Sequence, residues 1–195
     1  MKYQWICSGL MVATLCGCAI HQSPSNHQPH WAVLVDKSAN FYQVDDKLYR
    51  SEQLIDDDKQ TVHDNNIRTI INLRYFDRND DKVVFDDASV NLVNTPLLTW
   101  RVRPQEIAWV LYAVEQAQQD GAVLVHCYHG ADRTGIIIAM YRIIYQNWSI
   151  DEAKREMKQG DFGYHAIWKN LENMLTPITV AQVKSALTTI KNQQN

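Results

Sequence analysis

The sequence predicts an α/β fold in which a central mixed, mainly parallel sheet is flanked by helices. Three observations support this class. Short apolar runs alternate along the chain with longer segments whose apolar residues recur at helical spacing. Of the 195 residues, 46% are hydrophobic and 21% are charged, which is typical of one globular domain with a sizeable core. No internal repeat interrupts this order, so a single layered α/β domain is expected.

The strands are expected where the apolar runs are short. The first two flank the turn formed by Asp45 and Asp46, and the third is rich in isoleucine, which is typical of a buried strand. The fifth reads Ala-Val-Leu-Val-His and is also apolar enough to be buried. The predicted strands cover residues 41–44, 48–50, 68–73, 90–93 and 122–126.

The helices are expected in the longer segments between and after the strands. Pro104 suits the first position of one helix, and Gly121 ends the region that contains it. Ser149 and Glu152 form the pattern of a capping box, which predicts another helix after Ser149. The helix after Pro104 covers residues 105–119, and the other predicted helices cover residues 56–66, 134–146, 166–175 and 179–191.

The first 38 residues are expected to lie outside the folded domain, which we place at residues 39–195. Residues 1–17 are typical of a signal peptide, because Lys2 precedes an apolar run too short to span a bilayer. We assign residues 18–38 to a flexible tether, although the globular composition begins at residue 31. His21, His27 and His30 fall in the polar stretch without the spacing of a metal site.

The end of the apolar run, Leu15-Cys16-Gly17-Cys18, resembles the lipobox of bacterial lipoproteins. The resemblance implies cleavage before Cys18 and attachment of acyl chains such as palmitate to Cys18, which would anchor the exported chain in a membrane. Because Ala19 rather than aspartate follows, the outer membrane facing the periplasm is the expected location. An ordinary cleaved signal peptide and an uncut membrane anchor are the alternatives.

Charge and cysteine content exclude two function classes. The chain has 19 Lys and Arg residues against 22 Asp and Glu residues, a net charge of −3. A dedicated nucleic-acid-binding protein normally shows a basic excess, so no nucleic-acid partner is expected. Four cysteines are too few for a disulfide scaffold, and three of them precede residue 19. Cys127 is therefore the thiol left for chemistry in the folded domain.

The segment 123–136 combines a nucleophile with an anion-binding loop. A buried strand delivers Cys127 to its carboxyl end, where open α/β sheets bind ligands. A loop containing Gly130 follows, and a helix is expected to begin at Thr134-Gly135. Backbone N–H groups and a helix N-terminus bind anions and favour a thiolate, and Arg133 adds a planar grip on phosphate.

This segment resembles the signature loop of the cysteine-dependent protein-tyrosine and dual-specificity phosphatases. The matching residues are His126, Cys127, five further residues, Arg133 and Thr134. Segments 49–53, 71–74 and 162–170 are similar to bacterial members of that family, and the resemblance covers roughly residues 40–175. It implies a phosphatase domain that hydrolyses phosphomonoesters through a phosphocysteine.

The resemblance also implies roles for residues of the loop. Cys127 attacks phosphorus, Arg133 stabilises the transferring phosphoryl group, and Thr134 assists the second step by bonding the departing thiolate. His126 tunes Cys127, with a plain structural histidine as the alternative. No metal or other cofactor is required. The phosphate is held by residues 128–133, that is Tyr128, His129, Gly130, Ala131, Asp132 and Arg133.

One expected residue is missing. These phosphatases usually protonate the leaving group with an aspartate on a separate loop, but the segment 94–106, NTPLLTWRVRPQE, contains no aspartate. Asp132 is the best substitute, because the myotubularin lipid phosphatases carry an aspartate at the equivalent position. The alternative for Asp132 is a structural role. Glu106 and Asp161 are weaker candidates, and His165 is a residue that can approach the site.

The sequence is compatible with more than one class of substrate. Phosphotyrosine or phosphoserine and phosphothreonine in proteins are the first choice, and Trp100 could select an aromatic ester. His129, Arg101 and Arg103 would instead suit a phosphoinositide or inositol phosphate, as in a myotubularin-like enzyme, unless the arginines are plain surface residues. A non-catalytic phosphate-binding module is the alternative of another class, although a binder does not need the thiol.

Overall fold

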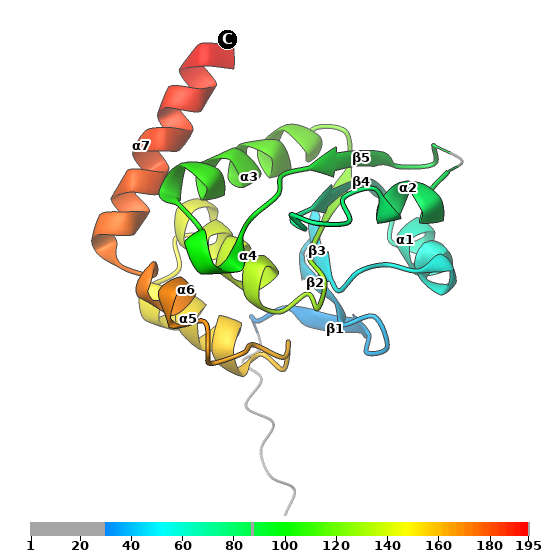
Figure 1. Ribbon diagram of the computed structural model, residues 1–195, viewed down its shortest axis with the longest axis horizontal. Coiled ribbons are helices and arrows are strands. Elements are labelled where there is room, and N and C mark those ends of the chain that lie inside the picture. Colours follow the sequence, from blue (N-terminus) through cyan, green and yellow to red (C-terminus); the bar gives the residue numbers. More distant parts are fainter. Residues whose placement is uncertain (1–29, 87, 195) are drawn as a thin grey trace, which may run out of the picture.

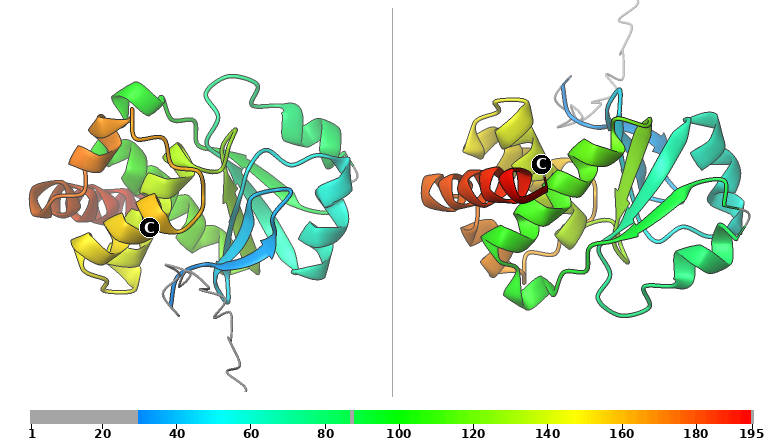
Figure 2. Two further views of the ribbon diagram at one scale, coloured as in Figure 1. Left: turned by 90° about the horizontal axis from the view of Figure 1, so that it is seen from below. Right: turned by 90° about the horizontal axis from the view of Figure 1, so that it is seen from above.

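The computed structural model describes residues 30–86 and 88–194, and in this part of the chain a six-stranded sheet separates two unequal layers of helices (Figure 1, Figure 2). The strand order is β1-β2-β3-β6-β4-β5. The strands are β1 (Val33–Asp36), β2 (Phe41–Asp45), β3 (Leu48–Ser51), β4 (Ile67–Asn72), β5 (Asn91–Asn94) and β6 (Ala122–His126).

The predicted fold class is confirmed. β6 pairs in parallel with both β3 and β4, and β4 pairs in parallel with β5, whereas β1–β2 and β2–β3 are antiparallel. In the register of the three central strands, His126 lies between Ser51 and Asn72. The strands β3, β6 and β4 therefore end at one edge of the sheet, and Cys127 follows directly from the middle one.

The helices form a large layer and a small one on opposite faces of the sheet (Figure 2). α1 (Lys59–Asp64) and α2 (Asp80–Val84) cover the small face, and short 3₁₀ turns lie at Asp56–Asp58 and Thr99–Arg101. The large layer contains α3 (Pro104–Ala117), α4 (Asp132–Tyr145), α5 (Ile150–Gln159), α6 (Lys169–Asn173) and α7 (Pro177–Gln194).

The alternation of side chains in β6 explains why both faces need helices. Val123 and Val125 belong to the core under the large layer, while Leu124 belongs to the core under the small layer. All three are fully buried, and burying such a side chain contributes about 1.5–3 kcal/mol. A continuous apolar run is what a central parallel strand requires, so β6 is found at the predicted residues.

α4 is the innermost helix, and it begins within the last two residues of the Cys127 loop, which we define as residues 127–133. Its residues 134–143 are all buried and mostly apolar, as expected for a helix inside a core. A buried ion pair joins it to α5, because Glu156 accepts hydrogen bonds from Arg142 Nε (2.9 Å) and Nη2 (2.7 Å). α4 begins at Asp132, two residues before the predicted start.

The tether predicted at residues 18–38 is too long, because its last residues belong to the fold. Trp31 and Ala32 are buried, and β1 pairs with β2. Trp31 Nε1 donates to Glu152 (2.7 Å), and the backbone N–H of Ala32 donates to Glu156 (2.8 Å). The sequence signal was weak because β1 is an edge strand whose apolar side chains are exposed.

Other predicted elements shift by a few residues. The predicted helix 56–66 is a 3₁₀ turn followed by the shorter α1, and α2 was not predicted at all. The signal peptide, Cys18, His21 and His27 lie outside the described residues. Among the described residues, no helix combines the length and the apolar character needed to cross a membrane.

Candidate active site

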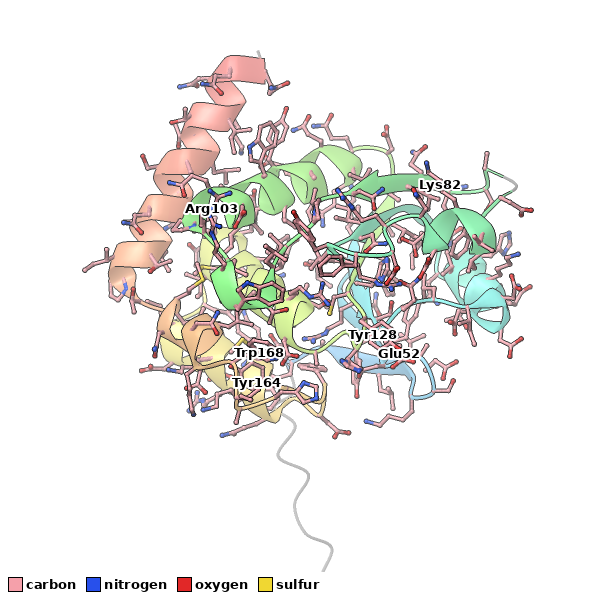
Figure 3. All side chains as sticks on the ribbon, in the orientation of Figure 1. Glu52, Lys82, Arg103, Tyr128, Tyr164 and Trp168 are labelled. Atoms are coloured by element: carbon pink, nitrogen blue, oxygen red, sulfur yellow. The ribbon has the colours of Figure 1, made fainter. Side chains whose placement is uncertain are left out.

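Cys127 lies at the floor of a cavity at the carboxyl edge of the sheet. Only 2% of its surface is exposed, so a reactant reaches it only through this cavity. The cavity has a volume of about 470 Å³, and Figure 3 labels two residues of its wall, Tyr128 and Trp168. The lining residues are Thr99, Cys127, Tyr128, His129, Asp132, Arg133, His165, Ile167 and Trp168.

The carbonyl groups of the Cys127 loop are held from outside it. Tyr128 O accepts from the backbone N–H of Gln53 (3.0 Å), His129 O from Asn40 Nδ2 (2.8 Å), and Gly130 O from Arg50 Nη2 (2.6 Å). Three successive carbonyls are thus bound by residues outside the loop. Loops whose backbone N–H groups are not used by their own carbonyls are suited to bind anions.

Gly130 is required by this turn. Its φ is +66°, a left-handed conformation that side chains rarely adopt. A Cβ atom there would lie 2.4 Å from the carbonyl oxygen of Ser51 and 2.7 Å from the backbone nitrogen of Glu52. Glycine therefore lets the loop pack directly on the end of β3.

Arg133 and Thr134 follow at the first turn of α4. Arg133 lines the cavity and its Nη1 lies 3.4 Å from the carbonyl oxygen of Leu73. Thr134 is fully buried, and its Oγ1 has no hydrogen-bond partner among the described residues. A buried hydroxyl without a partner needs an explanation, and a hydrogen bond to a thiolate or a bound phosphate would supply it.

His126 faces the small helical layer and binds Asp81 of α2. His126 Nε2 lies 3.1 Å from Asp81 Oδ2, and His126 Nδ1 lies 3.2 Å from the carbonyl oxygen of Cys127. Asp81 also accepts hydrogen bonds from Asn72 Nδ2 and Gln53 Nε2, both at 2.7 Å. Burial works to raise the pKa of Asp81, but these hydrogen bonds and the charge of His126 outweigh it and lower that pKa.

The Asp81 network joins α2, β4 and the base of the Cys127 loop. It fixes the ring of His126, so the predicted tuning of Cys127 by His126 would act through backbone placement. That role stays a prediction. Sequence reasoning missed Asp81, because it lies in a charged segment with no pattern that singles it out.

Arg50 is a second residue that the sequence did not mark as part of the site. It is 1% exposed, and its guanidinium carbon lies 3.7 Å from the centre of the Phe162 ring. Burial lowers the pKa of Arg50 to about 10, so it keeps its charge at neutral pH. Arg50 therefore places a positive charge behind the Cys127 loop while it binds Gly130 O. The only available signal was an arginine at the end of a fully buried strand.

Asp132 is bound to His165 through both carboxylate oxygens. Oδ1 accepts the backbone N–H of His165 (2.8 Å), and Oδ2 lies 2.9 Å from His165 Nδ1. Asp132 is 8% exposed, whereas half of the His165 side chain is exposed. This contact holds the segment that carries His165, Ile167 and Trp168 against the Cys127 loop.

The structure does not bring the weaker sequence candidates to the cavity. Glu106 caps α3 by accepting hydrogen bonds from Arg103 N (2.8 Å) and Arg103 Nη2 (2.7 Å). Asp161 pairs with Lys37 at 2.7 Å. Trp100 and Arg101 are exposed and, like Arg103, are not among the residues that line the cavity.

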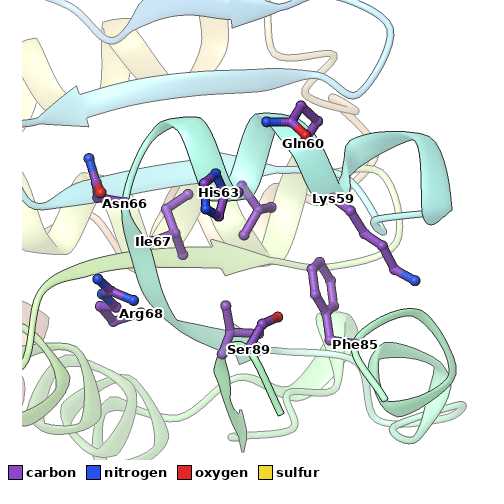
Figure 4. A pocket seen from close by; sticks show the side chains of 10 residues that line it. Lys59, Gln60, His63, Asn66, Ile67, Arg68, Phe85 and Ser89 are labelled. Atoms are coloured by element: carbon purple, nitrogen blue, oxygen red, sulfur yellow. The ribbon is translucent and has the colours of Figure 1, made fainter. Parts of the chain in front are cut away.

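A second hollow, of about 240 Å³, lies between α1, the start of β4 and the end of α2 (Figure 4). Lys59, His63, Arg68 and Phe85 are among its lining residues, and it shares none with the Cys127 cavity. Within residues 30–86 and 88–194, no group of three or more His, Cys, Asp or Glu side chains is arranged to hold a metal ion.

Known proteins resemble this chain in sequence and in structure. A family model described as "Polymorphic toxin system, DSP-PTPase phosphatase" matches residues 44–147. The dual specificity protein phosphatase TpbA of Pseudomonas aeruginosa (strain UCBPP-PA14) is 34% identical over 158 residues, which cover 80% of this chain and 71% of that protein.

Solved structures agree with that comparison. The crystal structure of P. aeruginosa TpbA has a TM-score of 0.75 and 31% identity, and covers 82% of this chain and 98% of its own. A cysteine-to-serine variant of TpbA in complex with pTyr has a TM-score of 0.75 and 30% identity, with 82% and 97% covered. The core catalytic domain of the PP-IP phosphatase SIW14 from S. cerevisiae, at 20% identity and a TM-score of 0.62, covers 78% and 94% and shares the fold.

Proposed function

This chain belongs to the dual-specificity phosphatase family, and on that premise we propose that it hydrolyses phosphotyrosine in proteins through a phosphocysteine on Cys127. The observation that carries the proposal is the floor of the cavity. There Cys127, which is 2% exposed, and Arg133 line one cavity, and three carbonyls of the loop between them are bound by residues outside the loop.

The proposed reaction has two steps. The Cys127 thiolate attacks phosphorus in line, the P–O bond to the substrate breaks, and the phosphoryl group is left on sulfur. Water then attacks the phosphorus, the S–P bond breaks, and phosphate and the thiolate are released. Arg133 and the loop N–H groups stabilise the charge on the phosphoryl oxygens in both steps. Thr134 Oγ1, buried without a partner among the described residues, is suited to donate to the departing thiolate.

The cavity wall supports an aromatic phosphoester. Cys127 is 2% exposed, so the ester oxygen must be carried inward by a long side chain. Tyr128 and Trp168 line the cavity, and aromatic rings stack favourably on a phenol. A tyrosine side chain therefore suits the cavity better than serine or threonine. TpbA, the relative whose variant was solved with pTyr, points to the same substrate class.

Inositides are less favoured by the same surroundings. Arg103, one of the two arginines that would have bound extra phosphates, is paired with Glu106. Arg101 does not line the cavity, and Arg133 is the arginine that does. His129 lines the cavity too, as does His165, but neither carries the permanent charge of an arginine, so a multiply phosphorylated ring gains less from them than from arginine side chains.

We also propose that the chain is an exported lipoprotein anchored through Cys18 in the outer membrane and facing the periplasm. The order of Lys2, the apolar run and the sequence ending in Cys18 supports this. Labelling of cells with radioactive palmitate should mark the natural chain and the Cys16→Ala variant, but not Cys18→Ala. Equal labelling of Cys18→Ala, or no labelling of the natural chain, would contradict the proposal.

The activity is tested by phosphate release from phosphotyrosine, phosphoserine and phosphothreonine peptides and from inositol phosphates. We expect the highest kcat/KM on phosphotyrosine and no turnover by Cys127→Ser or Arg133→Lys. Turnover that survives in Cys127→Ser would refute the phosphocysteine. A preference for inositol phosphates would mean that they, and not phosphotyrosine, are the substrate class. Binding of phosphate without any turnover would favour a non-catalytic module.

A further inference from the structure

We propose that His165, oriented by Asp132, is the group that protonates the leaving oxygen and then accepts a proton from the attacking water. This assignment deepens the proposed function and rests on it. It differs from the sequence-based hypothesis that Asp132 is itself the acid, and it assigns Asp132 the part of a positioning residue.

The cavity offers few groups that can carry a proton. The segment 94–106, where an aspartate was expected, contributes only Thr99 to the cavity wall. Glu106 and Asp161 are committed to Arg103 and Lys37 away from it. Besides the nucleophile Cys127 and the permanently charged Arg133, the titratable residues in the wall are Tyr128, His129, Asp132 and His165.

Asp132 is arranged as an acceptor. Both of its oxygens accept hydrogen bonds from residue 165, one from the backbone N–H and one from Nδ1 of the ring. A carboxylate in this position would have to break one of those bonds before it could deliver a proton to a substrate. Its geometry instead resembles that of a carboxylate that orients a histidine.

The same contact leaves His165 as the residue that can donate and accept a proton. An ionised carboxylate only accepts, so we assign the shared proton to Nδ1, which leaves Nε2 as the atom that exchanges protons. Half of the side chain is exposed and it lines the same cavity as Cys127. Histidine is the side chain that most often serves as an acid in one step and as a base in the next.

The backbone around His165 is fixed on both sides. Asn40 Nδ2 donates to Phe162 O (3.0 Å) and to His129 O (2.8 Å), which joins this segment to the Cys127 loop. Downstream, the backbone N–H of Trp168 donates to His165 O (3.1 Å). The ring is therefore placed by the packing of the segment as well as by Asp132.

His129 is the natural comparison. Its ring lies 5.5 Å from that of His165 and also lines the cavity, but no carboxylate binds it among the described residues. It packs edge-on against Tyr128 at 4.7 Å. The charged and titratable groups around His165 are thus Asp132, His129, Arg133, Tyr128 and Cys127, and among them Asp132 is the one that fixes its tautomer.

The protons balance over one turnover. In the first step Cys127 Sγ bonds to phosphorus, the P–O bond breaks, and the leaving oxygen takes the proton from Nε2 of the imidazolium. In the second step water loses a proton to Nε2 as its oxygen bonds to phosphorus, and the S–P bond breaks to restore the thiolate. The products are the alcohol or phenol and inorganic phosphate.

The test compares two aryl phosphates on the purified full-length protein. p-Nitrophenyl phosphate has a leaving group that departs without a proton, whereas phenyl phosphate needs one. His165→Gln should lower kcat for phenyl phosphate about 10²–10⁴-fold and change the first, phosphorylating step much less for p-nitrophenyl phosphate. His129→Gln is the matched control and should affect both substrates alike.

Asp132→Asn provides an independent second variant, because it keeps the shape but loses the fixed acceptor for Nδ1. It should show the same selective loss on phenyl phosphate, by a smaller factor. The rate at which iodoacetate alkylates Cys127 serves as the check that the site is intact in each variant. Restoration of phenyl phosphate turnover in His165→Ala by added imidazole would support the assignment further.

The outcomes separate the two proposals. Equal losses in the rate of the first, phosphorylating step on both substrates, followed as the burst of released phenol or p-nitrophenol, would overturn the role of His165 while Cys127-dependent turnover persists. Unchanged turnover of phenyl phosphate in His165→Gln would do the same. A selective loss in His129→Gln instead would move the role to that residue. Turnover that survives in Cys127→Ser would overturn the proposed function itself, whatever the His165 variants do.

Discussion

Replacing Glu156 by alanine should destabilise the protein more than any other single substitution at the contact between α4 and α5. Its carboxylate is 1% exposed and accepts hydrogen bonds from Arg142 Nε, Arg142 Nη2 and the backbone N–H of Ala32. Arg142 is itself 3% exposed. The substitution would leave a buried cation without its partner and a backbone donor without an acceptor.

The magnitude follows from that geometry. Removing one partner of a buried ion pair costs about 3–5 kcal/mol. In a domain of this size each kcal/mol lowers the melting temperature by about 2–4 °C, so a decrease of about 6–20 °C is expected. The double variant Arg142→Met, Glu156→Leu removes both charges and should recover much of the loss. It should not recover all of it, because the unpaired N–H of Ala32 still costs about 1–3 kcal/mol.

Urea unfolding followed by tryptophan fluorescence measures these free energies. Arg142 lies 4.2 Å from the centre of the Trp148 ring, so that fluorophore is close to the perturbation. A loss of less than about 1 kcal/mol in Glu156→Ala would refute the reasoning. So would a double variant that is as unstable as Glu156→Ala, because the cost would then not come from the stranded charge.

Three further changes have expected outcomes. Gly130→Ala should cost about 1–3 kcal/mol more than Gly163→Ala in urea unfolding, because both have positive φ but only the first Cβ meets backbone atoms. Arg50→Met should lower kcat about 10–150-fold with an unchanged circular dichroism spectrum, since it removes a charged hydrogen bond to the loop worth about 1.5–3 kcal/mol. The folded state lowers the pKa of Asp81, so its carboxylate stabilises the fold above about pH 4 and loses that effect as pH falls through the lowered pKa. The stability gap between the natural chain and Asp81→Asn, measured by urea unfolding, should therefore be full at pH 6 and narrower at pH 3.

Each of these expectations has a contrary result. Equal instability of the two glycine variants would remove the backbone clash as the cause. A kcat of Arg50→Met equal to that of the natural chain would show that the buried cation does not hold the Cys127 loop. A stability gap for Asp81→Asn that is the same at both pH values would contradict the lowered pKa.

The centre of the fold could be predicted from the sequence because neighbouring residues are enough to specify its elements. The apolar run of β6 requires burial on both faces, and Gly130 marks the turn after it. Pro104 begins α3 as predicted, and Ser149 accepts a hydrogen bond from the backbone N–H of Glu152 at the start of α5. Neighbouring residues decide these features, so one segment is enough to predict them.

The surroundings of the Cys127 loop could not be predicted from the sequence, because they depend on contacts between residues far apart in the chain. His165 meets Asp132 across 33 positions, and Asp81 meets His126 across 45. No sequence pattern around either aspartate indicates which distant residue it contacts. β1 was missed for another reason, since its outward apolar residues Val33 and Leu34 are exposed and show no alternation.

The contacts of residues 30–32 determine which elements would bear a mechanical force applied to the N-terminal side of the described chain. His30 and Trp31 bind Glu152, and Ala32 binds Glu156, so all three attach to α5 before β1 begins. α5 passes the load to α4 through Arg142, ten residues or about 15 Å along the helix from Asp132. Tension on residue 30 is therefore carried by α5 and the far half of α4. A force applied at residue 30 would therefore act on these contacts with α5 before it reached Asn40 and the Cys127 loop.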